Sequence, residues 1–206
     1  WQREYGRDGA YVKLAVAPGR LGRALRALPD LGFAGCNLTI PLKEAALACL
    51  DEVSPRARRI GAVNCVTVRP DASLSGDNTD GFGWRESVRE AVPDWRAEAG
   101  PAVLLGAGGA ARAVLDRLLG DGVPEVRVVN RSPARAAALR EAFGPRVVPV
   151  PWEGRAACLA GAATLVNTTS LGMTGQAPLD LALDALPAAA VVSDIVYVPR
   201  ETRLLA

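Results

Sequence analysis

The sequence has 206 residues, half of them hydrophobic, and its 24 basic residues nearly balance its 22 acidic residues. This length predicts one large domain or two modest ones, each able to bury a core. The interspersed charges exclude a basic stripe for nucleic acid or an anionic membrane surface, and the longest apolar runs are too short to span a bilayer. No segment resembles a signal peptide, so we expect a cytoplasmic protein. We expect it to be a monomer or a homodimer.

The chain contains no histidine, which excludes His-based triads, His general bases and most catalytic zinc sites. Its cysteines are scattered through apolar segments without CxxC pairs, namely Cys36, Cys49, Cys65 and Cys158. We interpret them as small buried hydrophobic residues and predict no metal site. Proton transfer must therefore rest on Lys, Asp, Glu, Tyr or Cys.

The first eighty or so residues mix strand and helix patterns. Alternation of apolar residues predicts strands, a spacing of three or four predicts helices, and a Pro-Asp turn predicts a hairpin. In chain order we expect a strand at Tyr11–Val16, a helix at Arg20–Leu28, a strand at Cys36–Ile40, a helix from Pro41 to Leu50, and a hairpin of Val63–Val68 with Leu74–Ser75. Strands that alternate with helices imply parallel pairing.

The second part of the chain follows a βαβ pattern. A helix is expected at Gly81–Val92 and a junction at Pro93–Gly100. The expected strands are Ala102–Leu105, Val126–Val129, Arg146–Val150, Thr164–Asn167 and Val191–Val196, and the expected helices are Ala110–Leu119 and Pro133–Phe143. This series predicts an open, Rossmann-type, doubly wound parallel sheet.

Lys43 is one of only two lysines, with Lys13, among basic residues that are otherwise arginine. A guanidinium cannot lose its proton in a protein, so a retained lysine indicates a position that needs an exchangeable proton. With a helix starting at Pro41, Lys43 would lie in a first helical turn, where the helix dipole disfavours a cation. A residue that violates a local structural preference in this way indicates a functional site. The alternative is a solvated lysine beside Glu44.

Asp80 lies in the polar cluster Asn78-Thr79-Asp80-Gly81, directly before an expected helix. Taken alone, it is typical of a helix N-cap. A carboxylate beside Lys43 would instead hold the ammonium in place and keep it a usable proton donor near neutrality.

The segment Gly106-Ala107-Gly108-Gly109-Ala110-Ala111 follows an expected strand and opens an expected helix. Such glycines let the backbone approach a pyrophosphate, while the helix N-terminus supplies amide hydrogens and a favourable dipole. A tight strand-to-helix turn would use the same residues. The βαβ context favours dinucleotide binding.

The end of the next strand discriminates between cofactors. An NAD enzyme places Asp or Glu there, whereas this chain has Asn130-Arg131-Ser132-Pro133-Ala134-Arg135. Arg131 and Arg135 can hold a 2′-phosphate through charge-assisted hydrogen bonds, so we predict NADP. Arg135 could otherwise be a solvated helical cation, and Ser132 an N-cap that also donates to phosphate.

Together these motifs make the chain similar to the shikimate dehydrogenase family. The resemblance extends over nearly the whole chain, in family order, and rests on seven segments: Asn37-Leu38-Thr39-Ile40-Pro41-Leu42-Lys43, Gly61-Ala62-Val63-Asn64, Asn78-Thr79-Asp80-Gly81, Gly106-Ala107-Gly108-Gly109-Ala110, Asn130-Arg131, Asn167-Thr168-Thr169-Ser170-Leu171-Gly172-Met173 and Tyr197-Val198-Pro199-Arg200-Glu201-Thr202. It implies NADP-dependent reduction of 3-dehydroshikimate to shikimate. It also implies an α/β fold of two lobes, with a substrate domain at 1–80 and a Rossmann NADP-binding domain at 81–206.

The resemblance further implies roles for individual residues. Lys43 and Asp80 would be the catalytic pair, and a small-molecule substrate would be bound by Asn37, Thr39, Lys43, Asn64, Asp80 and Tyr197. The cofactor would be bound by Gly106, Ala107, Gly108, Gly109, Ala110, Asn130, Arg131, Ser132, Arg135, Thr168, Thr169, Ser170 and Met173. Val198 departs from the family, which usually has Asn after this Tyr.

The family also has segments that this sequence lacks. They are an earlier strand and helix with a Ser-x-Ser motif that binds the substrate carboxylate, and a C-terminal helix with a substrate-binding Gln. The chain starts at Trp1, with Gln2 to Tyr5 typical of the end of an element already under way, and it stops at Ala206 without a cap. We interpret it as a fragment that can bind NADP and still turn over poorly.

Alternative functions stay open. A quinate/shikimate dehydrogenase of the same fold would have broader substrate and cofactor use, although Asn130-Arg131 argues against NAD. A non-catalytic NADP-binding module is a second alternative, against which the presence of both Lys43 and Asp80 speaks. Glutamyl-tRNA reductase shares a Gly-rich loop followed by Asn-Arg, but the lack of histidine and of tRNA-binding charge disfavours it.

Overall fold

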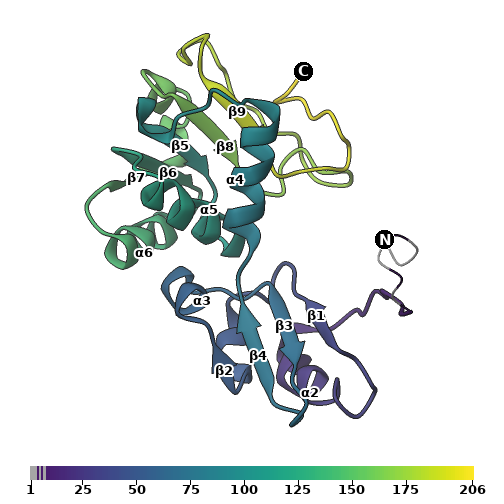
Figure 1. The fold of residues 1–206 in the computed structure, drawn as a ribbon. Helices are drawn as coiled ribbons and strands as arrows, with labels where there is room; N and C mark the ends of the chain where they lie inside the picture. Colours follow the sequence, from purple (N-terminus) through teal and green to yellow (C-terminus); the bar gives the residue numbers. More distant parts are fainter. Residues whose placement is uncertain (1–3, 5, 7) are drawn as a thin grey trace.

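The computed structural model describes residues 4, 6 and 8–206, so the expectation for Gln2–Tyr5 falls largely outside the described residues. Two lobes are joined where strand β4 (Leu74–Asp77) leads into helix α4 (Asp80–Ala91), as Figure 1 shows. Each lobe has its own sheet, one of four strands and one of five. The α/β fold in two lobes is therefore confirmed.

The first lobe contains a mixed sheet in the order β1-β3-β4-β2, formed by β1 (Gly35–Asn37), β3 (Cys65–Val68), β4 and β2 (Glu52–Val53). Strand β3 pairs antiparallel with both β1 and β4, and only β2 pairs parallel with β4. The expected hairpin is confirmed, but the expected parallel pairing is wrong for this lobe. The short turn between β3 and β4 permits only antiparallel neighbours.

The strand expected at Tyr11–Val16 is absent, and residues 8–17 have no regular structure. Tyr11, Val12 and Leu14 are 81%, 51% and 55% exposed. Alternation alone does not make a strand, because a strand needs a neighbour to accept and donate its backbone hydrogen bonds.

The first lobe also contains helical segments ahead of α4. A short 3₁₀ turn, η1 (Pro18–Arg20), leads into α2 (Leu21–Arg26), within the helix expected there. Helix α3 (Pro55–Ile60) was not predicted, although its ends carry clear signals: the Ser54 hydroxyl accepts from Ala57 N at 3.0 Å, and Gly61 closes the helix at φ +73°.

The helix expected from Pro41 to Leu50 is wrong. Residues 40–44 form turns, and only the 3₁₀ helix η2 (Ala45–Cys49) follows. The carbonyl of Lys43 accepts from Val63 N at 2.8 Å, so a contact with the strand region replaces an intrahelical hydrogen bond. Lys43 therefore does not lie in a first α-helical turn, and the dipole argument for it fails.

The second lobe contains five parallel strands in the order β7-β6-β5-β8-β9. The strands are β5 (Ala102–Leu105), β6 (Val126–Asn130), β7 (Val147–Pro151), β8 (Thr164–Asn167) and β9 (Val191–Asp194), with helices α5 (Gly109–Gly120) and α6 (Pro133–Phe143) and the short 3₁₀ turns η3 (Ala97–Ala99), η4 (Trp152–Gly154) and η5 (Ala157–Leu159). This is the predicted doubly wound parallel sheet, with element ends within about two residues of those expected.

The core of the second lobe includes helix α4 and the segment that follows it. Trp84 of α4 and Trp95 are both buried and pack edge to face, with ring centroids 5.8 Å apart. Their indole nitrogens donate to Ser193 and Thr164, each at 3.1 Å, so both polar ends are satisfied. Helix α4 thereby fixes its first residue, Asp80, relative to the parallel sheet.

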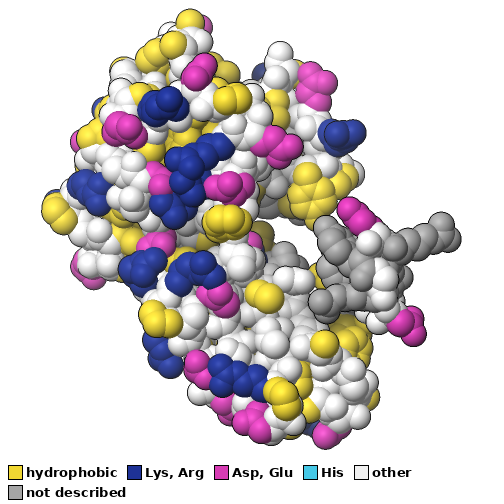
Figure 2. Space-filling view, in the orientation of Figure 1, with side chains coloured by type: hydrophobic (Ala, Val, Ile, Leu, Met, Phe, Trp, Pro, Cys, Tyr) yellow, Lys and Arg dark blue, Asp and Glu magenta, His cyan; other side chains and the backbone are white. Residues whose placement is uncertain are grey.

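The four cysteines are free, as expected, but each is partly rather than fully buried. No group of His, Cys, Asp or Glu among the described residues could hold a metal ion. Within the same residues, no helix has the length and apolar character needed to cross a membrane. Figure 2 shows Lys and Arg interspersed with Asp and Glu over the face drawn, so no surface of one charge extends across it.

Candidate active site

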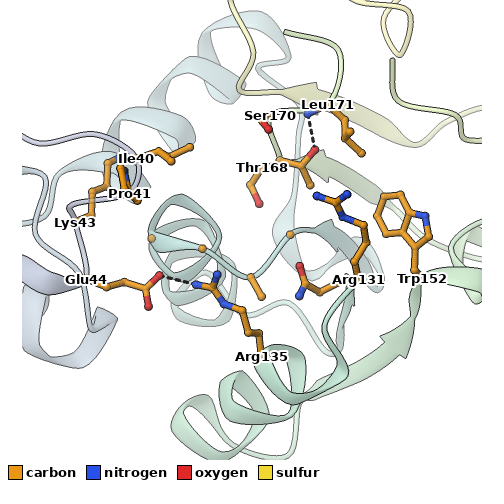
Figure 3. Close-up of a pocket in the computed structure, with 16 residues that line it drawn as sticks. Ile40, Pro41, Lys43, Glu44, Arg131, Arg135, Trp152, Thr168, Ser170 and Leu171 are labelled. Atoms are coloured by element: carbon orange, nitrogen blue, oxygen red, sulfur yellow. Dashed lines mark hydrogen bonds and ion pairs between the residues drawn. The ribbon is translucent and has the colours of Figure 1, made fainter. Parts of the chain in front are cut away.

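A cavity of about 290 Å³ lies between the two lobes (Figure 3). The first lobe contributes the turn that carries Lys43, and the second contributes the carboxyl ends of β5, β6, β7 and β8. Its lining residues are Ile40, Pro41, Lys43, Glu44, Gly106, Ala107, Gly108, Gly109, Asn130, Arg131, Arg135, Trp152, Thr168, Thr169, Ser170 and Leu171. Ligands of open parallel sheets bind at this edge.

The Gly-rich loop joins β5 to α5, and the reason for glycine differs from one position of the loop to the next. Gly106 has φ +107°, and a Cβ there would lie 2.8 Å from the Thr168 hydroxyl oxygen. A Cβ on Gly109 would lie 3.0 Å from Lys43 Cβ. At Gly108 nothing lies within 4 Å, so the protein itself does not require glycine there. Open space above a helix N-terminus fits an approaching phosphate.

The end of β6 brings polar groups to the cavity. Asn130 Nδ2 donates to the Ser132 carbonyl at 3.0 Å, which fixes the turn before α6. Ser132 occupies the N-cap position but makes no side-chain capping bond. Arg131 lines the cavity, as does Trp152 after β7, while Arg135 donates to the Glu44 carboxylate at 2.8 Å.

The loop after β8 forms the opposite wall. The Thr168 hydroxyl donates to the Leu105 carbonyl at 2.6 Å, which ties this loop to β5. The buried Asn167 accepts from Thr169 Oγ1 at 2.7 Å and donates to Asp194 Oδ1 at 3.0 Å. These bonds hold the loop against two neighbouring strands, so its cavity-facing residues are pre-positioned.

Lys43 and Asp80 form an ion pair from two different segments of the chain. Lys43 Nζ lies 2.6 Å from Asp80 Oδ2, and the side chains are only 14% and 25% exposed. The other oxygen, Oδ1, accepts from Asn64 Nδ2 at 2.6 Å. Asp80 N donates to Asn78 Oδ1 at 3.0 Å, so the Asn78 side chain anchors the first turn of α4. Asp80 is thus the first residue of α4 and not its N-cap.

A second layer of hydrogen bonds orients this pair. Asn64 Oδ1 accepts from Thr79 N at 2.9 Å, which fixes the amide so that its nitrogen faces Asp80. Asn37 Nδ2 reaches the Asn64 carbonyl at 3.4 Å, and Asn37 Oδ1 accepts from the Tyr11 hydroxyl at 3.0 Å. A chain of amides therefore connects β1 to the Lys43–Asp80 pair.

Eight of the predicted residues do not line the cavity: Asn37, Thr39, Asn64, Asp80, Ala110, Ser132, Met173 and Tyr197. Thr39 and Tyr197 are exposed, Tyr197 by 79%, and Met173 is 36% exposed. The cavity-lining residues that sequence reasoning missed are Ile40, Pro41, Glu44, Trp152 and Leu171. For Trp152 a signal was available, because it directly follows a strand next to β6 and so lies at the ligand-binding edge.

Asp77, the last residue of β4, lies where the first lobe leads into α4, three residues before Asp80. Burial alone would raise the pKa of Asp77, but Arg56, the Ser54 hydroxyl and the Asn78 amide all bond to it and bring its pKa below the usual value. Arg56 contributes through both Nε and Nη2. The end of β4 is therefore clamped onto α3.

Two family models match the chain. One, described as a shikimate dehydrogenase substrate binding domain, matches residues 1–66, and the other, described as shikimate / quinate 5-dehydrogenase, matches residues 88–172. The chain is 55% identical to a shikimate dehydrogenase (NADP(+)) of Paramagnetospirillum magneticum and 58% identical to one of Rhodospirillum rubrum. The whole chain aligns, over 75% and 74% of those proteins.

Solved structures give the same result. A Thermus thermophilus shikimate 5-dehydrogenase in complex with NADP(H) and shikimate is 43% identical, with a TM-score of 0.78 over 99% of this chain and 73% of that one. A quinate dehydrogenase of Corynebacterium glutamicum in complex with NAD is 33% identical, with a TM-score of 0.83 over 99% and 75%. The chain thus spans about three quarters of the length of these relatives.

Proposed function

The chain belongs to the shikimate dehydrogenase family, and on that premise we propose that it interconverts 3-dehydroshikimate and shikimate with NADP(H). The observation that carries this proposal is the Lys43–Asp80 ion pair at 2.6 Å, placed directly against the Gly-rich loop. A proton donor beside a dinucleotide loop is what reduction of a ketone requires.

NADPH, when held in the cavity, would supply the hydride for the reduction. Lys43 Nζ donates a proton to the carbonyl oxygen as it becomes a hydroxyl, and solvent then returns a proton to the amine. Asp80 holds the ammonium through Oδ2, while Asn64 holds Asp80 through Oδ1. In the oxidation the same groups act in reverse, with Lys43 accepting the hydroxyl proton.

The cofactor assignment rests on the residues that surround the cavity. The open backbone at Gly108 fits a pyrophosphate, with Gly106, Ala107, Gly109 and Ala110 forming the rest of the loop. Strand β6 ends at Asn130 and is followed by Arg131, with no carboxylate there, which favours NADP over NAD. Ser132, Arg135, Thr168, Thr169, Ser170 and Met173 complete the cofactor-binding set that we propose.

We assign residues 1–80 to the substrate-binding unit and 81–206 to the cofactor-binding unit. The separate sheets, and the burial of Trp84 in the core of the second lobe, support this boundary. In the substrate-binding unit, the hydrogen bonds of Asn37 and Asn64 orient the Lys43–Asp80 pair, and substrate contacts for both are assigned from the family motif. Thr39 and Tyr197 are assigned from the family motif.

Reduced-nicotinamide absorbance tests the proposal. Purified chain with shikimate and NADP should develop the absorbance band, and quinate with NAD should give a far slower rise. A faster reaction with quinate and NAD would assign the chain to quinate dehydrogenases. NADP binding without turnover of either substrate would instead identify a cofactor-binding module.

A further inference from the structure

The carboxylate of Glu44 reaches out of its own lobe to two arginines of the other lobe. Its Oε1 accepts from Arg135 Nη2 at 2.8 Å, and its Oε2 lies 3.9 Å from Arg112 Nε. Figure 3 shows Glu44 and Arg135 meeting at the edge of the cavity. Arg135 is one of the two arginines proposed to bind the 2′-phosphate, so an internal carboxylate already holds that guanidinium.

The Glu44–Arg135 pair is open to solvent. The Glu44 side chain is 40% exposed and that of Arg135 is 54% exposed, and exposed ion pairs are weak. A phosphate dianion, which carries more charge and more acceptor oxygens than a carboxylate, can therefore displace Glu44 from Arg135.

Arg112 gives the displaced carboxylate a counter-ion. The Arg112 side chain is only 20% exposed, and its Nε is buried without a hydrogen-bond partner among the described residues. Its Nη1 is held by the Ile60 carbonyl at 3.3 Å. Because Glu44 already lies 3.9 Å away, a small shift would satisfy Arg112 Nε when Arg135 is released.

We propose that Glu44 is a specificity-determining residue that competes with the cofactor's 2′-phosphate for Arg135. This inference rests on the NADP preference proposed above. A cofactor without the 2′-phosphate leaves the pair intact, whereas NADP must replace Glu44. Glu44 therefore reduces the discrimination between NADP and NAD. The Glu44–Arg135 contact between the lobes weakens phosphate binding, and by linkage a bound phosphate weakens that contact to the same extent.

Titration calorimetry with adenosine 2′,5′-bisphosphate and adenosine 5′-monophosphate isolates this end of the cofactor from the chemistry. E44Q should tighten binding of the bisphosphate about two- to fivefold, the range expected for an exposed ion pair. Binding of the monophosphate should change less than twofold. E98Q removes the same charge at an exposed position of η3 and should change neither.

The pairing is tested by repeating E44Q in an R135Q background, where the gain should disappear. A gain that persists without Arg135, an equal gain for both ligands, or weaker binding of the bisphosphate would overturn the competition. If wild type prefers the bisphosphate and E44Q leaves that preference unchanged, only this inference fails. If neither protein prefers it, the NADP assignment fails as well.

Discussion

Lys43 has two properties that bear on chemistry, its charge and its exchangeable proton. Lys43→Arg keeps the charge and the partner Asp80 but removes a proton that can be exchanged near neutrality. We expect kcat to fall by roughly 10² to 10⁴ with little change in NADP affinity. Steady-state kinetics and cofactor titration measure the two separately.

The chain provides its own control for this substitution. Lys13, the only other lysine, is exposed and lies outside regular structure, so Lys13→Arg should leave kcat unchanged. Asp80→Ala should resemble Lys43→Ala, and the double variant should be little worse than the poorer single one, because the pair acts as a unit. Retention of most turnover by Lys43→Arg would reduce Lys43 to an electrostatic role.

Arg131 is the cavity-lining arginine for which the structure shows no ion pair within 4.0 Å among the described residues, in contrast to Arg135. We expect Arg131→Ala to weaken NADP by about 1.5 to 3 kcal/mol, the value of a charge-assisted hydrogen bond, and to weaken NAD far less. Titration calorimetry with both cofactors checks this. Arg23→Ala, at an exposed position of α2, should affect neither. Equal losses would remove the phosphate assignment.

At the scale of elements, one substitution in the Gly-rich loop can distinguish an effect on stability from an effect on cofactor binding. Nothing lies within 4 Å of a Cβ at Gly108, which is the N-cap of α5, so Gly108→Val should lower the free energy of unfolding by no more than about 1 kcal/mol, the value of the cap. The added side chain would fill the space proposed for the pyrophosphate, and NADP binding should be lost.

Urea unfolding and calorimetry measure these two effects on the same protein. Gly19→Val, which also meets nothing within 4 Å, should keep both stability and NADP affinity. Undiminished NADP affinity in Gly108→Val would make the loop only a strand-to-helix turn.

The hydrogen bonds and ion pair of Asp77 predict that the free energy of unfolding falls at low pH. The pKa of Asp77 is lowered in the folded state by its bonds to Arg56, Ser54 and Asn78, which outweigh the effect of burial. A depressed carboxyl pKa contributes stability that is present above the unfolded value, about 3.9, and is lost as the pH falls through the folded value. Asp77→Asn should be less stable than wild type at neutral pH, and the difference should shrink below about pH 4.

Urea unfolding at a series of pH values measures that difference. Asp30→Asn is the matched control, because Asp30 is exposed and lies in no ion pair within the described residues. A gap between Asp77→Asn and wild type that stays constant from neutral to acid would contradict the role of the carboxylate charge.

The parallel lobe was predictable because buried strands and Gly-rich turns repeat a local pattern, and α6 begins and ends at the predicted residues. The first lobe was less predictable because its pairings are non-local. The Lys43 carbonyl bonds to Val63 instead of continuing a helix, and the exposed Tyr11 contacts β1 through its hydroxyl and forms no strand. The site motifs were readable from sequence. The Glu44–Arg135 contact was not, because only the packing of the lobes brings those residues together.

At the scale of the whole molecule, the relation between the lobes depends on how closely α4 approaches α5. A Cβ on Gly81 would lie 2.4 Å from the Ala113 carbonyl oxygen, a backbone atom that cannot move aside alone. Asp116 lies one turn further along α5 than Ala113, and it pairs with Arg59 of α3 at 2.7 Å. This ion pair holds the first lobe against α5 as well. Gly81 therefore sets the position of the neighbouring Asp80 against the Gly-rich loop.

Gly81→Ala should force α4 away from α5. We expect a loss of about 1 to 3 kcal/mol in the free energy of unfolding, as for other overpacked contacts, together with lower kcat because the Lys43–Asp80 pair shifts from the cofactor. Gly83→Ala lies in the same helix, meets nothing within 4 Å and should gain up to about 1 kcal/mol from helix propensity. Urea unfolding and shikimate oxidation of both variants provide the comparison. If Gly81→Ala matched Gly83→Ala in stability and turnover, the close helix contact would not be what aligns the two lobes.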